Sequence, residues 1–405
     1  MIIIARLTTT ALNVATVARP WLNPRIHALA CVATVARPWS NPLIHAQASV
    51  ATKAIPRSLL TVKTQNLLAI AVLTLFATIF SGCVSKPPQE VVVYCALDRE
   101  FSEPVLNEFE QQSGISVSAK YDVESTKTVG LVTAIINEKR RPRCDLFWNN
   151  EILHTMRLQK MGLLEVYHSP AAKSFPASYR SADGDWYGLA ARARVLIVNT
   201  ERIADPGQWP RSIKDLADPK WKGQAAMAKP LFGTTATHAA VLFSVWGDEA
   251  AKDFFQQVKE VTAIESGNKQ VAVSVSSGKY AFGITDTDDA IIEQEKGKPI
   301  AIIFPDQADD QMGTLFIPNS LCLIKGSANQ ENARQLLDYL LSPAVEEQLA
   351  NGESAQFPVN PAVTSHSRAQ PADVEIKWMD VDFEQAADAW DTAANFLREE
   401  FQAAD

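Results

Sequence analysis

The segment that decides the fold is Tyr280-Ala-Phe-Gly-Ile-Thr-Asp-Thr-Asp-Asp-Ala-Ile-Ile292. Its first half, residues 280–284, is a short apolar run that is typical of a buried strand. Its second half, residues 285–289, holds two threonines and three aspartates where a helix is expected to begin. Threonine and aspartate cap helix N-termini, but three adjacent carboxylates repel one another and need a cation, ligand hydroxyls or solvent. Because ligands bind beyond the carboxyl ends of strands in open α/β sheets, we expect this turn to line a ligand cleft; the alternative is an elaborate helix cap.

The composition describes a globular protein. The chain has 405 residues, of which 47% are hydrophobic and 21% are charged, and this length suggests two or three domains. The formal net charge is −8 and no basic stripe stands out, which argues against nucleic acid as a partner. The five cysteines form no CxxC pair and show no Cys/His spacing of a metal site.

The first 58 residues differ from the rest of the chain. The segment that begins Val14-Ala-Thr-Val-Ala-Arg-Pro-Trp recurs from Val32, a period of 18 residues. Two copies of so short a unit cannot build a core. We interpret residues 1–58 as a leader, either disordered or the product of a start codon placed too early, and exclude them from the fold.

Residues 59–83 are interpreted as a lipoprotein signal peptide. The apolar run 67–80 is 14 residues long and follows basic residues, which suits a signal-peptide core better than a membrane span. It ends in Phe80-Ser-Gly-Cys83, which resembles a bacterial lipobox, so we expect Cys83 to be acylated. An uncleaved membrane anchor is the alternative. Residues 84–89 would then be a tether, and the remainder would work outside the cytoplasmic membrane.

From Glu90 onward, short apolar runs alternate with helical segments. The main expected strands are 91–94, 117–121, 144–148, 186–200, 224–228, 280–284, 299–304 and 313–325. The main expected helices are 103–112, 128–139, 151–161, 269–276, 289–295, 332–341, 344–350 and 383–401, with further helices starting near 234 and 249. Such alternation predicts parallel sheets covered by helices on both faces.

Two of the expected strands, 186–200 and 313–325, are longer than ordinary strands. We expect both to cross between two α/β lobes, with lobe 1 formed by residues 90–193 plus 315–405 and lobe 2 by residues 194–314. Hinged lobes that close on a ligand are one known consequence of this arrangement. A rigid enzyme with a site between its domains is the alternative, because a fold does not determine a function.

A resemblance to a known family covers about Glu90 to Val363. It rests on Val92-Val-Tyr94, Cys144-Asp-Leu-Phe147, Arg192-Ala-Arg-Val195, Leu216-Ala-Asp-Pro-Lys-Trp-Lys-Gly223, Gly283-Ile-Thr-Asp286, Leu341-Ser-Pro343 and Phe357-Pro-Val-Asn360. By these motifs the chain resembles a bacterial extracellular solute-binding protein, the receptor subunit of an ABC importer, and within that superfamily it looks most like the ferric-ion-binding branch.

The resemblance implies the α/β fold of the type II periplasmic binding proteins, with two mixed sheets flanked by helices and joined by two hinge strands. It also implies a monomer, not an enzyme, that hands a small solute or metal to ABC permease and ATPase subunits. Such a protein would be held in the cell envelope by its lipid anchor and would face the periplasm or the exterior.

The ligand residues of the ferric branch do not carry over cleanly. Its members hold iron with two adjacent tyrosines, often joined by a histidine and a glutamate. The tandem-tyrosine position appears here as Thr287-Asp288, the histidine position as Asp98, and the glutamate position falls on or beside Asn150-Glu151. Ferric iron is a hard cation that suits oxygen ligands, so one hypothesis is a site of Asp98, Glu151, Asp286 and Asp288. A calcium-like or magnesium-like ion would accept the same oxygens. No cofactor other than such cargo is expected.

The opposite hypothesis is a phosphorylated or zwitterionic solute. Ser125 and Thr126 begin one expected helix and Gly233-Thr-Thr235 begins another, and helix starts rich in hydroxyls bind oxyanions. The resemblance places anion contacts at the second of these turns and at Asn268. Arg192 and Arg194 on the crossing strand would complete a bidentate grip. The simpler alternatives are plain helix caps and, by strand alternation, one arginine that faces solvent or a salt bridge.

A single site with residues from both lobes accommodates both hypotheses. It consists of Tyr94, Asp98, Arg99, Ser125, Thr126, Asn149, Asn150 and Glu151 from lobe 1 and of Arg192, Arg194, Gly233, Thr234, Thr235, Asn268, Asp286, Thr287 and Asp288 from the crossing strand and lobe 2.

A cysteine-dependent enzyme on the same fold is a further alternative, because Cys95 and Cys144 fall near strand ends. A reactive cysteine needs a nearby base or cation, and Arg99 is a candidate cation for Cys95. Neither cysteine has a histidine close to it in the sequence. We therefore predict a binding protein rather than an enzyme.

Overall fold

The computed structural model describes residues 89–122, 128–372 and 374–402. Val84–Asp405 forms one compact unit, separate from Met1–Cys83. The expected leader, the signal peptide with Cys83, most of the tether, and Ser125 and Thr126 lie outside the described residues. Within the described part of the chain, no helix has the length and apolar character needed to cross a membrane.

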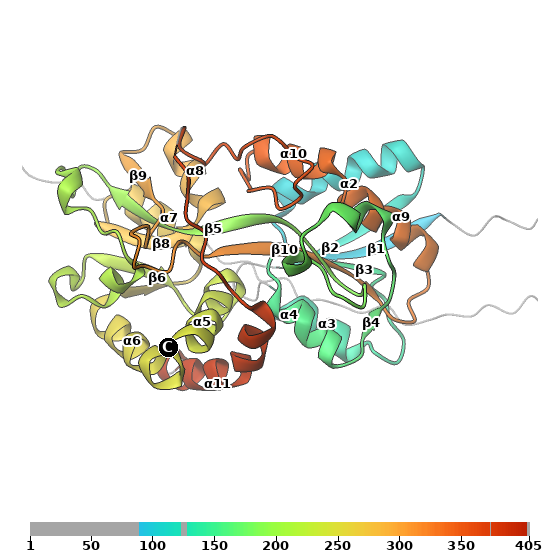
Figure 1. Ribbon diagram of the computed structural model, residues 1–405, viewed down its shortest axis with the longest axis horizontal. Helices are drawn as coiled ribbons and strands as arrows, with labels where there is room; N and C mark the ends of the chain where they lie inside the picture. The colour runs from blue at the N-terminus through green and yellow to red at the C-terminus, as the bar shows by residue number, and fades with distance from the viewer. Residues whose placement is uncertain (1–88, 123–127, 373, 403–405) are drawn as a thin grey trace, which may run out of the picture. The chain divides into compact units, whose positions relative to one another are not determined.

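Lobe 1 is built on a mixed sheet in the order β2-β1-β3-β10-β5 (Figure 1). Its own strands are β1 (Glu90–Cys95), β2 (Ser116–Tyr121), β3 (Leu146–Asn149), β4 (Leu164–Glu165) and β10 (Phe316–Ile324). The first three strands are parallel, and β10 runs antiparallel to β3. The helices are α2 (Arg99–Ser113), α3 (Val129–Asn137), α4 (Leu153–Lys160), α9 (Gln330–Leu340) and α10 (Pro343–Asn351).

Lobe 2 continues the sheet in the order β5-β8-β6-β7, with β9 also paired to β5. Its strands are β6 (Ala225–Ala228), β7 (Ala263–Glu265), β8 (Phe282–Asp286) and β9 (Ile300–Ile303). Its helices are α5 (Gly233–Trp246), α6 (Asp248–Val261), α7 (Asn268–Ser276) and α8 (Thr287–Glu295). Short 3₁₀ helices cover Pro170–Ser174, Ala177–Tyr179, Pro206–Gln208, Ile213–Ala217 and Pro219–Trp221.

The strand β5 (Tyr187–Asn199) joins the two lobes. All of its 13 residues are buried, which explains why its side chains are mostly small and apolar, apart from the paired arginines Arg192 and Arg194. Its first half pairs with β10 up to Ala193, and its second half pairs with β8 and β9 from Arg194 onward. The predicted α/β fold is confirmed, and β5 makes the two sheets continuous, as predicted for residues 186–200. The other predicted crossing, residues 313–325, forms β10, which pairs with β3, β4 and the first half of β5 and with no strand of lobe 2 in the described structure.

The C-terminal helix α11 (Phe383–Phe401) packs on α5 and α6 of lobe 2 and on α4 of lobe 1. Its apolar face is buried, and Lys259 Nζ of α6 lies 3.0 Å from a carboxylate oxygen of Glu400. On the other side, Lys160 of α4 pairs with Asp388. Residues 315–405 were expected in lobe 1, and α11 at their end contacts elements of both lobes.

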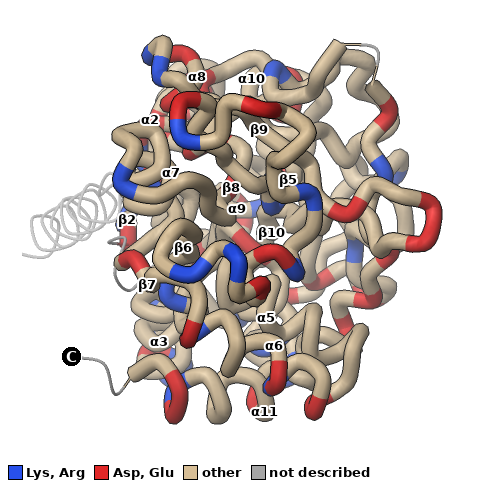
Figure 2. Tube along the Cα trace, turned by 90° about the vertical axis from the view of Figure 1, so that its left-hand side faces the viewer, with Lys and Arg blue, Asp and Glu red and all other residues tan. Residues whose placement is uncertain are grey.

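Lys and Arg segments and Asp and Glu segments are both spread over the visible trace (Figure 2).

Candidate functional site

Three helices of lobe 2, α5, α7 and α8, begin at a common cleft. Their N-cap residues are Phe232, Gly267 and Asp286, and none of the three makes a side-chain hydrogen bond to its own helix. The first N–H groups of a helix have no partner within the helix, and they carry the positive end of the helix dipole. Residues from all three helix starts line the cleft, so its lobe 2 wall presents backbone donors and positive potential.

Asp286 ties two of these helix starts together. It is the last residue of β8 and is 2% exposed. Its carboxylate accepts hydrogen bonds from Arg194 Nη1 at 2.6 Å, from Thr234 Oγ1 at 2.6 Å and from Asn268 Nδ2 at 3.0 Å. Arg194 Nη2 also donates to Thr235 Oγ1 at 3.2 Å. One buried carboxylate and one buried guanidinium therefore set the position of the α5 start relative to the α7 start.

Burial alone would raise the pKa of Asp286, but Arg194, Arg192 and the hydrogen bond from Thr234 outweigh burial and lower it. Asp286 is therefore ionised at neutral pH. His238, on the same side of α5, is also affected by this cluster. Burial and the charge of Arg194 lower the pKa of His238 to about 3, so its ring is neutral.

Arg192 connects the acidic turn to lobe 1. Its Nη1 lies 3.3 Å from Asp288 Oδ2 and 3.5 Å from Asp286 Oδ2, and its Nη2 donates to the carbonyl oxygen of Asn150. Burial would lower the pKa of Arg192, but Asp288 and Asp286 raise it, so the guanidinium is charged. Both predicted arginines therefore face the acidic turn and form salt bridges there, and neither faces solvent.

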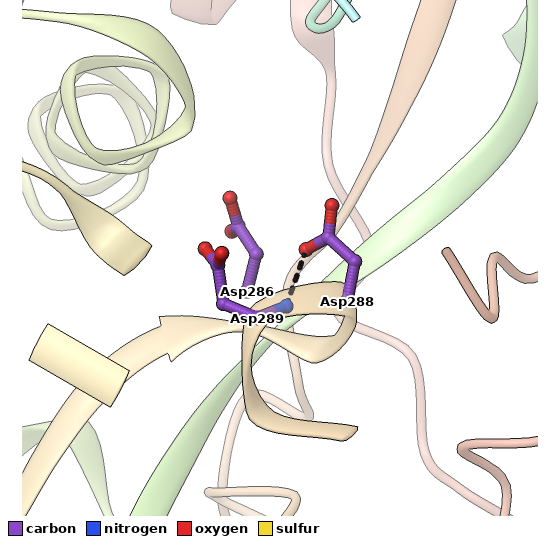
Figure 3. Close-up of side chains that lie close together, drawn as sticks. All are labelled: Asp286, Asp288 and Asp289. Atoms are coloured by element: carbon purple, nitrogen blue, oxygen red, sulfur yellow. Dashed lines mark hydrogen bonds between the residues drawn. The ribbon is translucent and has the colours of Figure 1, made fainter. Parts of the chain in front are cut away.

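The acidic turn brings three carboxylates together, those of Asp286, Asp288 and Asp289 (Figure 3), with oxygens within 4.8 Å of one another. Two of the three carboxylates are already neutralised, because Asp286 pairs with Arg194 and Asp288 pairs with Arg192. Hard cations are normally bound by carboxylates that are not engaged in this way. The cluster is close to neutral, not strongly anionic.

Thr287 lies away from the cleft. Its Oγ1 accepts a hydrogen bond from the Ala193 N–H at 3.2 Å, and its side chain is fully buried against β5. The resemblance placed the tandem-tyrosine position at Thr287-Asp288. In the acidic cluster the two consecutive residues are instead Asp288 and Asp289, one position later. Asp289, which belongs to the expected turn 285–289 but not to the predicted metal ligands, lines the cleft.

On the lobe 1 side, Glu151 has a structural role. Its carboxylate is fully buried and accepts hydrogen bonds from the Leu153 N–H at 2.6 Å, from Asn149 Nδ2 at 2.6 Å and from Thr237 Oγ1 of α5 at 2.9 Å. Burial would raise the pKa of Glu151, but His154 and these hydrogen bonds lower it. Glu151 thus caps α4 and holds it to lobe 2, which leaves no free oxygen for the predicted metal.

Tyr94, Asp98 and Arg99, the other described lobe 1 residues predicted for the site, are not among the residues that line the cleft. The Tyr94 hydroxyl donates to Glu138 at 2.9 Å, and its ring is part of the core. Arg99 pairs with Glu103 at 2.6 Å, and 67% of its side chain is exposed. Asp98 is the N-cap residue of α2, and its charge contributes to raising the pKa of Arg192.

The cleft itself is narrow. Its walls are Asn150, Arg192, Ala228, Lys229, Phe232, Gly233, Thr234, Thr235, Ser266, Gly267, Asn268, Asp286 and Asp289. Its volume is about 20 Å³, room for about one water molecule. Lys269 Nζ of α7 lies 3.3 Å from Glu100 Oε1 of α2, which joins lobe 2 to lobe 1. A larger solute can therefore enter only when the lobes are further apart.

The described cysteines do not resemble nucleophiles. Cys95, Cys144 and Cys322 are buried and form no disulfide with one another. Burial raises the pKa of both Cys144 and Cys322, and the Cys144 thiol donates to the carbonyl oxygen of Leu146 at 3.1 Å. A reactive cysteine has a lowered pKa, so the environment of Cys144 does not support the cysteine-enzyme alternative.

Comparison with known proteins places this cleft in context. The family described as bacterial extracellular solute-binding protein matches residues 148–386. The Fe(3+)-binding periplasmic protein of Serratia marcescens is 21% identical over 296 residues, which cover 72% of this chain and 85% of that protein.

Two solved structures share the fold. The apo ferric ion-binding protein A of Pasteurella haemolytica aligns with a TM-score of 0.69 at 22% identity, covering 78% of this chain and 100% of that one. The periplasmic binding protein AfuA of Actinobacillus pleuropneumoniae, solved with fructose-6-phosphate, aligns with a TM-score of 0.68 at 24% identity, covering 78% of this chain and 99% of that one. At these identities the likeness establishes the fold.

Proposed function

The chain belongs to the family of bacterial extracellular solute-binding proteins, and we propose that it is the receptor of an ABC importer for a phosphorylated or phosphonate small molecule. In this proposal Cys83 carries a lipid anchor in the cell envelope, and the loaded protein docks on permease and ATPase subunits. The observation that supports the ligand class is the convergence of three helix N-termini without side-chain caps on one cleft.

The donors of the cleft suit an oxyanion. The starts of α5 and α7 offer backbone N–H groups to the cleft. The hydroxyls of Thr234 and Thr235 donate to Asp286 and Asn268, which holds these helix starts in place. Lys229 and Arg192 also line the cleft, so a phosphate group would meet both hydrogen-bond donors and positive charge. Asp289 lies in the same wall and would accept a hydrogen bond from a hydroxyl or ammonium group elsewhere on the ligand. The ligand class is therefore a phosphate or phosphonate that also carries such a donor.

A hard cation with an accompanying anion is the second candidate. Three carboxylates within 4.8 Å of one another favour it, and the Serratia marcescens relative is named for ferric iron. For a cation to bind there, however, Arg192 and Arg194 would have to release Asp288 and Asp286. The free energy lost in breaking two buried ion pairs makes this candidate the weaker one.

Calorimetry on the mature chain, purified without chelator, distinguishes the two candidates. We expect binding of fructose 6-phosphate or 2-aminoethylphosphonate, no binding of fructose, and no stoichiometric iron by metal analysis. Thr235→Val removes a hydroxyl at the α5 start and should weaken binding at least tenfold, or about 1.4 kcal/mol. Thr392→Val, on an exposed position of α11, is the matched control. Stoichiometric bound iron without phosphate-ester binding would establish the second candidate instead.

A further inference from the structure

A second cavity lies between α4, α5 and α11, which are neighbours in Figure 1. Its volume is about 290 Å³, much larger than the 20 Å³ of the ligand cleft. Its walls are largely apolar and include Leu231, Phe232, Trp390 and Leu397. Among the described residues, Phe232 is the one that lines both spaces. A volume near 300 Å³ is at the lower end of small-molecule sites, about 300–1,000 Å³.

Two guanidinium groups line this cavity without a carboxylate partner. The guanidinium of Arg157 lies over the Trp390 ring, 5.3 Å from the ring centroid. Within the described chain, this cation–π contact is the interaction that the guanidinium makes. Arg398 donates to the Ala394 carbonyl oxygen of its own helix at 3.0 Å and to Asn395. Asp391 is the one acidic residue in the described lining, so the cationic groups outnumber the acidic ones.

We propose that this cavity is a second binding site, for a small amphipathic carboxylate. An aromatic ring or short alkyl chain would lie against Trp390, Phe232 and Leu397, where it is removed from water. Its carboxylate would meet Arg157 and Arg398, whose planar guanidinium groups match a carboxylate in a bidentate arrangement. An apolar body with a single anionic head complements both the walls and the charge of the cavity.

The position of the cavity links it to movement of the lobes. Arg157 is on α4 of lobe 1, Phe232 precedes α5 of lobe 2, and Trp390 is on α11, which contacts both lobes. Phe232 is also the N-cap residue of α5, directly before the turn that lines the ligand cleft. A molecule bound here therefore contacts elements whose separation changes when the cleft opens.

Calorimetry with two matched probes, 4-phenylbutyrate and 4-phenylbutylamine, tests the proposal on the mature chain. We expect the carboxylate to bind at least tenfold more tightly than the amine. The double variant Arg157→Gln/Arg398→Gln should weaken the carboxylate at least tenfold, whereas Arg140→Gln on the exposed surface should leave it unchanged. Ala394→Phe places a ring in the cavity and should abolish binding.

Three outcomes overturn the proposal: no saturable binding of 4-phenylbutyrate, equal binding of both probes, or unchanged binding in the double variant. Circular dichroism checks that Ala394→Phe is folded. If Ala394→Phe does not fold, the double variant still tests the proposal, because Arg398 is exposed and Arg157 is half-buried. Binding at the ligand cleft is measured separately with fructose 6-phosphate, so either site can fail without the other.

Discussion

Replacement of Asp286 by Asn tests the cluster at the cleft. The substitution keeps the size of the side chain but removes its charge and exchanges one acceptor oxygen for an NH₂ donor. Asp286 Oδ1 accepts from Arg194 and Asp286 Oδ2 accepts from both Thr234 and Asn268. Whichever oxygen becomes NH₂, a donor will face a donor in a buried site.

The loss of stability should be large because Asp286→Asn leaves the buried guanidinium of Arg194 without its ion-pair partner. The Arg194 side chain is 1% exposed, and its ion pair with Asp286, at 2.6 Å, is the only ion pair that it makes in the described structure. Removing one partner of a buried ion pair costs about 3–5 kcal/mol. Arg192 keeps Asp288 at 3.3 Å, so we expect the lower end, about 3 kcal/mol. A change of 1 kcal/mol shifts the melting temperature of a domain of this kind by about 2–4 °C, which gives a decrease of about 6–12 °C.

The loss should also depend on pH. The pKa of Asp286 is lowered in the folded protein, because the two arginines and Thr234 outweigh its burial. A carboxyl with a lowered folded pKa stabilises the fold above its unfolded pKa of about 3.9, and this contribution disappears as the pH falls through the folded value. The difference between wild type and Asp286→Asn should therefore be constant from pH 7 to about 5 and shrink below about 4.

Urea unfolding followed by tryptophan fluorescence and circular dichroism measures this difference. Asp218→Asn is the matched control, because Asp218 makes an exposed pair with Lys220 at 2.9 Å and exposed pairs contribute about 0–1 kcal/mol. If Asp286→Asn unfolds within 1 kcal/mol of the wild type at pH 7, or its deficit is the same at pH 3.5, the cluster does not hold the helix starts as argued.

Three further predictions concern the lobes, the expected lipid anchor and the buried histidine. Small-angle scattering should show a smaller radius of gyration when solute is added at a concentration that saturates the site in calorimetry. An unchanged radius would contradict hinged lobes. Cys83→Ser should move the protein from the membrane fraction to the soluble fraction, and an unchanged membrane fraction would contradict acylation. The His238 ring should stay neutral from pH 8 to about 4 in NMR titrations, because burial and Arg194 lower its pKa to about 3. Its ring takes up a proton near pH 6.5 only when unfolded, so stability should fall below that pH, and a folded midpoint near 6.5 would contradict the buried environment.

The fold could be predicted because buried strands and helices have recognisable apolar patterns in the sequence. β5 is buried on both faces along all 13 residues, so its run of apolar and small side chains is too long for one ordinary strand. The acidic turn 285–289 does follow a buried strand, as predicted, but β8 ends at Asp286 and α8 begins at Thr287, each two residues from the expected boundary. What the pattern could not show is where each side chain of that turn points. Strand alternation stops at Asp286 and helical spacing begins, which buries Thr287 and brings Asp289 to the cleft.

Contacts between distant segments were harder to predict than the elements themselves. Arg194 and Asp286 are cross-strand partners in the antiparallel pair β5 and β8, a register that a single sequence does not specify. Glu151 illustrates the same limit, since Thr237, which engages it, lies 86 residues away on the other lobe. A residue expected to bind a ligand proved to hold two elements of the protein together.

The identity of the ligand depends on how charge is counted in the cleft. Counted alone, Asp286, Asp288 and Asp289 favour a cation. Counted with the two buried arginines that the fold places against them, they form a cluster whose charge is mostly cancelled. The helix starts add positive potential to this nearly neutral cluster, so the balance moves toward an anion. The same three carboxylates thus support opposite ligands depending on whether β5 is paired with β8, and it is the pairing that favours a phosphorylated solute.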